Sequence, residues 1–191
     1  MSGEYPEKLK VFAREVNGVF SYGSNPSTTL RGKGWSKAEI RIPGPGYEIF
    51  YVAFSGTNSS EVYSGFYAAG KLPAGLFCRI TEQDGFTRLI STFSSYNMKS
   101  GKAEFDKKLH TACNNKDFLL KLSGNHETAH FLKQSIRRPL RFEVMTNEKG
   151  LLQDQRRSAM IMSLHSNEWI VEKDALTSLL DGFRKIVAQF N

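Results

Sequence analysis

Residues 37–54 read KAEIRIPGPGYEIFYVAF and predict two antiparallel strands joined by a turn. Apolar side chains alternate with charged ones over 37–42, which is typical of a sheet with one face in water. Residues 47–54 are apolar on both faces, which indicates a central strand that is covered on two sides. The proline and glycine residues at 43–46 supply the turn. This hairpin favours a fold built on an antiparallel sheet.

Working outward from the hairpin, the same patterns predict further elements on both sides. Further strands are expected over 61–69, 76–81, 109–113, 140–144 and 159–164. Helices are expected over 6–17, 117–122, from 125 to the proline at 139, and 174–190. Residues 21–35 read as a loop, and 86–93 fit either a short helix or a strand. The early strands follow one another through turns, so we expect them to form a meander.

The last helix has the strongest pattern in the chain. Its apolar face is broad and consists of Leu176, Leu179, Leu180, Phe183, Ile186, Val187 and Phe190. We expect this helix to dock on the sheet. The whole chain, 1–191, is predicted to be one α+β domain with an N-terminal helix, a central helix pair and this C-terminal helix. A division into two lobes near 94–103 is the alternative.

Composition narrows the class of protein. The chain is 40% hydrophobic and 12% aromatic, which indicates a globular rather than a disordered chain. It contains no apolar run of the ~18 residues that a spanning helix needs, and no N-terminal stretch reads as a signal peptide. Cys78 and Cys113 lack metal-site spacing and predict two buried, reduced thiols. We therefore expect a cytoplasmic location, with the cytoplasmic face of the inner membrane as the alternative.

His126-Glu127-Thr128-Ala129-His130 has the H-E-x-x-H pattern of zinc hydrolases. In such enzymes two histidines one helical turn apart bind Zn²⁺, and the glutamate is the general base. On this hypothesis zinc is the cofactor, His126 and His130 are ligands and Glu127 is the base. A third ligand is required, and the downstream candidates are Glu143, Glu148, Glu168, Glu172 and His165.

The local sequence favours the opposite interpretation. Gly124 and Asn125 indicate that the helix begins at the motif itself, with Asn125 as its N-cap. Ala129, Leu132 and Ile136 form the apolar stripe of this helix, and both histidines fall roughly 110° from its centre. We therefore expect two histidines on a surface helix, with no catalytic residue, no metal and no cofactor.

The charge pattern suggests an anionic partner. The chain has a net charge of +7. Residues 131–157 contain seven bases and three acids, among them Arg137, Arg138, Arg141, Arg156 and Arg157. Such a surface attracts anionic lipid or an acidic protein, and nucleic acid is a further alternative. Aromatic residues do not alternate with these bases as they do on base-stacking surfaces, which makes nucleic acid the weaker alternative.

A short signature follows the predicted lobe boundary. Residues 100–106, SGKAEFD, precede a strand, a short helix over 117–120 and a second helix. This order resembles an uncharacterised group of bacterial proteins that share a glycine turn, Glu-Phe-Asp, a strand and a Leu-Leu helix, often beside membrane segments. The resemblance covers roughly residues 30–190 and implies an α+β fold with a non-enzymatic or unknown role. In physical terms, Gly101 permits the turn, Phe105 enters the core and Asp106 caps backbone donors.

Together these observations predict a non-catalytic α+β domain that meets an anionic membrane surface or a protein partner. The zinc hydrolase and the nucleic-acid binder are the alternatives.

Overall fold

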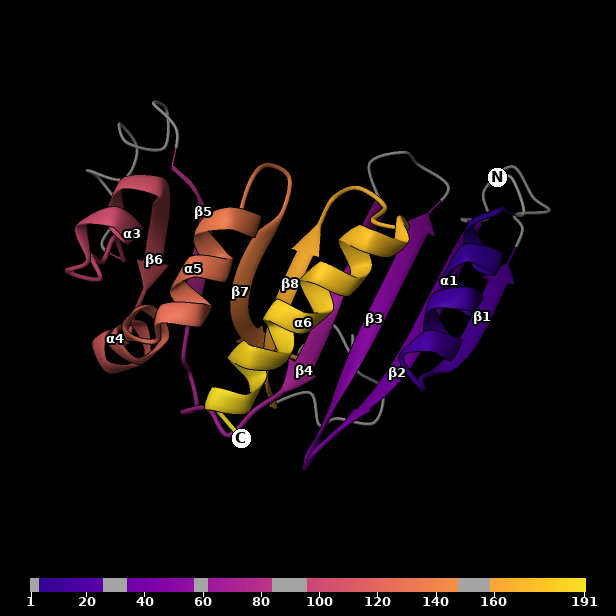
Figure 1. Cartoon of the computed structure of the whole chain (residues 1–191), viewed down its shortest axis with the longest axis horizontal. Helices are drawn as coiled ribbons and strands as arrows, with labels where there is room; N and C mark the ends of the chain where they lie inside the picture. The colour runs from indigo at the N-terminus through magenta and orange to yellow at the C-terminus, as the bar shows by residue number, and fades with distance from the viewer. Residues whose placement is uncertain (1–3, 26–33, 57–61, 84–95, 148–158) are drawn as a thin grey trace.

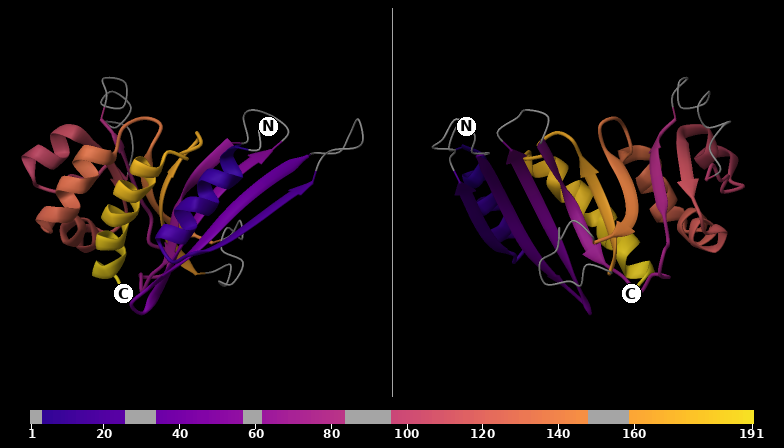
Figure 2. Two further views of the ribbon diagram at one scale, coloured as in Figure 1. Left: turned by 45° about the vertical axis from the view of Figure 1, so that its right-hand side comes forward. Right: turned by 180° about the vertical axis from the view of Figure 1, so that it is seen from behind.

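The computed structural model describes residues 4–25, 34–56, 62–83, 96–147 and 159–191. Within these residues the strands form one antiparallel sheet in the order β1-β2-β3-β4-β8-β7-β5-β6. Helices α1, α5 and α6 lie over one face of this sheet, while α3 and α4 lie at its β6 end (Figure 1). Seen from behind, the strands have no helix in front of them (Figure 2). The α+β class predicted from the sequence is confirmed.

The bounds of the elements follow. The strands are β1 (Val19–Asn25), β2 (Trp35–Gly44), β3 (Tyr47–Gly56), β4 (Val62–Ala69), β5 (Cys78–Glu82), β6 (Leu109–Cys113), β7 (Arg141–Thr146) and β8 (Met160–Ser166). The helices are α1 (Glu4–Glu15), α3 (Ala103–Lys108), α4 (Lys116–Gly124), α5 (His126–Ser135) and α6 (Lys173–Gln189). The segment 86–93, for which a short helix or a strand is expected, lies outside the described residues.

The β2–β3 hairpin forms as predicted. Ile40 pairs with Tyr51 and Ile42 with Ile49, and all four side chains are buried on the face that the helices cover. On the other face Phe50 and Val52 join Tyr67 and Ile161 in a separate buried cluster. The strand over 47–54 is therefore apolar on both faces because both of its faces are buried.

Two strand predictions were wrong. Residues 21–25 are not loop but belong to β1, which pairs with β2 along the edge of the sheet. The meander ends at β4, because the next strand in the sheet is β8 and not β5. β5 instead pairs with β6 on one side and β7 on the other. The suggested boundary near 94–103 lies between β5 and β6, which are neighbours in the same sheet.

The helices close the core from one side. The expected docking of the C-terminal helix is confirmed, since Phe183 of α6 lies with its ring centroid 6.4 Å from that of Phe66 on β4. At the β1 end of the sheet, α1 buries Leu9, Phe12 and Ala13. Among the described residues, no helix is both long and apolar enough to cross a bilayer.

The turn before α3 follows the physical interpretation of its sequence. Gly101 has a φ of +80°, a conformation that glycine adopts without steric cost. The Asp106 carboxylate accepts hydrogen bonds from the backbone N–H groups of Ser100 (2.9 Å) and Gly101 (3.1 Å). Phe105 is buried in the core. The predicted N-cap of α5 is also present, because the Asn125 side chain accepts from Thr128 N–H at 3.1 Å.

Candidate functional site

The H-E-x-x-H motif lies on the surface of α5. His126 and His130 are both exposed, and their rings lie nearly parallel with centroids 6.2 Å apart. They line a shallow groove between α5 and α6 together with Asp181 and Lys185. Lys185 forms an ion pair with Glu127 at 2.9 Å. Its ammonium lowers the pKa of Glu127, which makes this carboxylate a weaker base than a free one.

The proposed third ligands lie elsewhere. Glu143 and His165 are on the face of the sheet that has no helices, and Glu172 pairs with Lys8 of α1. Glu168 follows β8, and Glu148 lies outside the described residues. Across the described ranges no three His, Cys, Asp or Glu residues are grouped so that they could hold a metal ion.

The predicted basic residues are divided between two surfaces. Arg137 and Arg138 are exposed in the turn between α5 and β7. Arg141 lies on the helix-free face, where its guanidinium donates to His165 Nε2 (2.8 Å) and to the Asn167 side-chain oxygen (2.9 Å). Arg156 and Arg157 lie outside the described residues. The interval 131–157 is therefore not one patch.

The fold assembles a larger basic surface than the sequence interval suggested. Residues 97–141, here called the basic end, contain ten bases and four acids, an excess that accounts for six of the chain's seven net positive charges. Eight of the bases are exposed and form the surface of this end, whereas Lys133 and Arg141 are partly buried, and Arg141 lies on the helix-free face. The ten are Lys99, Lys102, Lys107, Lys108, Lys116, Lys121, Lys133, Arg137, Arg138 and Arg141. Figure 1 shows this segment at the β6 end of the sheet, opposite α1 and β1.

Two of the four acids at the basic end are engaged by other groups. Asp106 is turned onto the backbone of Ser100 and Gly101, and Glu127 pairs with Lys185 of α6. Glu104 and Asp117 stand in the first turns of α3 and α4, where their charge favours the helix dipole. The acids therefore have structural roles while most of the bases face solvent.

Short elements hold the basic end in place. The Asn115 side chain caps α4 by accepting from Phe118 N–H at 2.9 Å. The Lys116 ammonium donates to the carbonyl of Lys99 and so ties α4 to the turn before α3. Phe118, Leu119 and Leu122 are buried beneath these lysines. The lysines of this end therefore project from well-packed secondary structure.

Two apolar side chains project among these bases. Leu120 of α4 is 43% exposed and follows Lys116 by one helical turn. Tyr96 is 52% exposed and packs edge-on against Phe77 with ring centroids 5.7 Å apart. The Tyr96 carbonyl faces β6, because Cys113 N–H donates to it at 2.8 Å. Lysine, tyrosine and leucine side chains together are typical of surfaces that meet the headgroup region of a bilayer.

A polar cluster on the helix-free face has the residue types of a catalytic triad. His165 Nδ1 lies 3.1 Å from the Ser163 hydroxyl, and Glu143 is close by. Because the Arg141 guanidinium can only donate, His165 Nε2 must accept, and Nδ1 therefore carries the proton. The imidazole then donates to Ser163, whose hydroxyl donates to the Glu143 carbonyl at 3.2 Å. This direction is opposite to the one that activates a serine nucleophile.

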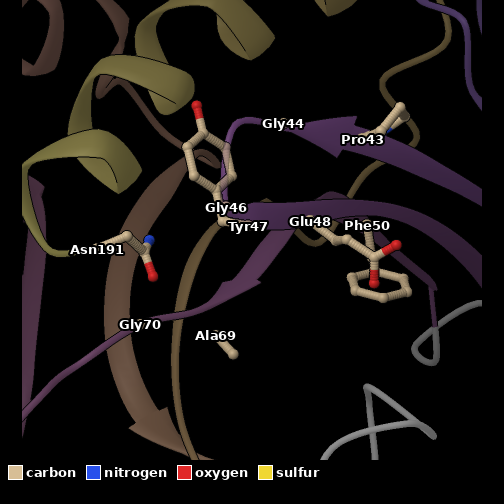
Figure 3. A pocket seen from close by; sticks show the side chains of 9 residues that line it. All are labelled: Pro43, Gly44, Gly46, Tyr47, Glu48, Phe50, Ala69, Gly70 and Asn191. Carbon is tan, nitrogen blue, oxygen red and sulfur yellow. The ribbon is translucent and has the colours of Figure 1, made fainter.

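A second hollow lies at the end of the β2–β3 hairpin, beside the C-terminal residue (Figure 3). Tyr47 and Glu48 line it but point to opposite sides of the strand (Figure 3). The Glu48 carboxylate is held by the Arg41 guanidinium through two hydrogen bonds of 2.7 and 2.8 Å. The polar groups of this hollow do not converge on one point, so it lacks the arrangement of a small-molecule site.

No family model matches the chain, and neither a curated protein nor a solved structure matches it.

Proposed function

We propose that this protein is a non-catalytic binding module that docks on an anionic membrane surface through its basic end. The observation that carries this proposal is the separation of charge: six of seven net charges lie in residues 97–141, at one end of the sheet. A protein with such a distribution meets an anionic surface in one preferred orientation.

The magnitude of the attraction fits reversible binding. A lysine or arginine close to an anionic bilayer contributes about 1 kcal/mol. If about half of the eight exposed bases reach the bilayer surface together, their summed contribution to the binding free energy is about 4 kcal/mol. This value corresponds to a dissociation constant of about 1 mM. Burial of Leu120 in the headgroup region would add to this value. Docking is therefore expected to be weak, reversible and strongly dependent on salt.

The side chains between the bases favour lipid over nucleic acid. Seven of the ten bases are lysines, which act as point charges rather than as bidentate readers of phosphate or bases. The apolar side chain of Leu120 would make no favourable contact with the phosphates of a nucleic acid, but it fits the boundary between lipid headgroups and acyl chains. An extended aromatic platform, on which unpaired bases stack, is not formed by the described residues of this end.

The test is cosedimentation with vesicles of phosphatidylcholine that contain increasing fractions of phosphatidylserine. Binding is expected to rise with the phosphatidylserine fraction and to fall as salt increases from about 0.1 M to about 1 M, where the Debye length shrinks from ~10 Å to ~3 Å. The double variant Lys107→Glu/Lys108→Glu should abolish binding. The matched control Lys10→Glu/Arg14→Glu makes the same change in net charge on α1, at the other end of the molecule. This control should retain most of the vesicle binding.

Three outcomes contradict the proposal. The first is equal loss of binding in the two double variants, which would mean that only net charge matters. The second is binding that is independent of phosphatidylserine. The third is tighter binding to duplex DNA or single-stranded RNA than to vesicles at the same salt concentration. A Leu120→Gln variant distinguishes insertion from pure electrostatics, because it should weaken vesicle binding without changing its salt dependence.

A further inference from the structure

Cys78 and Cys113 lie directly opposite each other on neighbouring strands. Cys78 begins β5, Cys113 ends β6, and the antiparallel register pairs them. Both are free thiols, and both are buried on the face of the sheet that the helices cover. The sequence indicated two buried, reduced thiols but did not place them next to each other.

The hydrogen bonds of the ladder define the geometry of this pair. Asn114 N–H donates to the Phe77 carbonyl at 3.0 Å, and Gln83 N–H donates to the Lys108 carbonyl at 2.9 Å. Hydrogen-bonded and non-hydrogen-bonded pairs alternate along an antiparallel ladder. The pair 78/113 is next to the bonded pair 77/114, so it belongs to the non-hydrogen-bonded class.

That class brings side chains closest together. Its Cα atoms lie about 4.5 Å apart, and its side chains approach more closely than those of the bonded pairs. A disulfide requires a Cα separation of about 4.4–6.8 Å. The two backbones therefore need little or no movement for a bond between the sulfur atoms.

The two thiols also differ in reactivity. A hydrogen bond from Cys78 stabilises the Cys113 thiolate and lowers the pKa of Cys113 to about 7. The same hydrogen bond, with burial, raises the pKa of the Cys78 thiol. Cys113 is thus the attacking sulfur and Cys78 the resolving one, since the thiolate is the nucleophilic form of cysteine.

We propose that Cys78 and Cys113 form an oxidation site that hydrogen peroxide closes into a cross-strand disulfide. The Cys113 thiolate attacks one peroxide oxygen, the O–O bond breaks, and the departing hydroxide takes a proton to become water. Cys113 is then a sulfenic acid. The Cys78 sulfur attacks the Cys113 sulfur, the S–O bond breaks, and the hydroxyl leaves as water with the proton of Cys78. The two thiols supply the two electrons that reduce one peroxide to two waters.

The location gives the bond a structural consequence. β6 leads through Asn114 and Asn115 into α4, which carries Lys116, Leu120 and Lys121 of the basic end. A bond between β5 and β6 would fasten this segment covalently to the sheet. Oxidation is therefore expected to raise the thermal midpoint of the full chain and to slow amide exchange in β5 and β6.

The experiment treats the purified full chain with hydrogen peroxide and measures intact mass and alkylation of thiols in denaturant. The expected product has lost two hydrogen atoms and both alkylatable thiols, and dithiothreitol restores them. Digestion without reductant should yield the Cys78 and Cys113 peptides linked to each other. In Cys78→Ser the reaction should stop at a sulfenic acid on Cys113 that dimedone traps, and in Cys113→Ser the remaining thiol should react far more slowly.

The proposal is overturned if both thiols of the wild-type chain survive the treatment. It is equally overturned if Cys113 proceeds to sulfinic acid without a linked peptide, or if the only disulfides join two molecules. Peptide mapping of the wild-type chain decides between these outcomes even if a serine variant does not fold.

Discussion

At the scale of single residues, the turn before α3 shows how one side chain can fix a segment. Ser100 is buried, and its N–H would lack a partner if Asp106 did not turn back to accept it. Gly101 supplies the left-handed conformation that makes this return possible. These roles could be predicted from the sequence because they depend only on residues 100–106.

Removal of the Asp106 carboxylate should therefore destabilise the fold. Asp106→Ala leaves two backbone N–H groups without their acceptor, and we expect it to lower the free energy of unfolding by about 1–3 kcal/mol. Glu104→Ala, an exposed position in the same helix, should change it by no more than about 0.5 kcal/mol. Urea denaturation measures both values, and equal effects would contradict the capping role.

His110 gives the fold a dependence on pH. Burial lowers the pKa of His110 below its ordinary value, and the nearby Lys99 charge lowers it further. Its Nε2 is buried and has no hydrogen-bond partner among the described residues. An unfolded histidine titrates near 6.5, so between the folded and unfolded pKa values the unfolded chain binds more protons.

Stability should therefore be fully present above a pH of about 6.5 and should fall as the pH drops towards the folded pKa of His110. In His110→Gln this part of the pH dependence should disappear. Lys99→Gln should raise the pKa of His110, because it removes a repelling charge. An NMR titration that places this pKa at or above 6.5 would refute the assignment.

At the scale of elements, local patterns predicted what local interactions determine. The β2–β3 hairpin and the helix α6 could be predicted because their patterns are local. Alternation in β2 and the apolar stripe of α6 can each be recognised within one continuous segment of sequence. β1 was missed because an edge strand needs no buried face: most of Val19–Asn25 is exposed, and pairing with β2 alone defines it. β5 was assigned to the wrong neighbour because the insertion of β8 beside β4 is a long-range pairing that leaves no local pattern.

The β4–β8 pairing that the sequence did not show depends on a glycine. A Cβ at Gly65 would lie 2.5 Å from both His165 Cβ and the Leu164 carbonyl oxygen. Neither atom can withdraw, because the two strands are joined by their ladder. Gly65→Ala should therefore lower the free energy of unfolding by about 3 kcal/mol.

Gly124 provides the matched control for this substitution. A Cβ there meets no atom within 4 Å, so Gly124→Ala should be neutral or should stabilise α4 by up to about 1 kcal/mol. Thermal melting of the two variants makes the comparison. A tolerated alanine at position 65 would mean that β4 and β8 are less closely joined than described.

At the scale of the whole molecule, charge is the property that only the fold assembles. The sequence interval 131–157 contained part of the basic surface, but it mixed Arg137 and Arg138 with Arg141, which faces the other way. The lysines of α3 and α4 lie outside this interval and form no run in the sequence, because they occur in separate short elements that each contain acids as well. A running net charge over 97–141 would have found them, although not their position at one end of the sheet.

The orientation of the bound protein is the most direct test of this proposed function. Backbone amide NMR spectra would be recorded with phosphatidylserine-containing bicelles that carry a paramagnetic lipid headgroup. We expect amide signals of residues 97–141 to broaden, most strongly near Leu120, while those of α1, β1 and β2 remain sharp. Broadening centred on β1 and α1, or distributed evenly over the molecule, would contradict docking through the basic end.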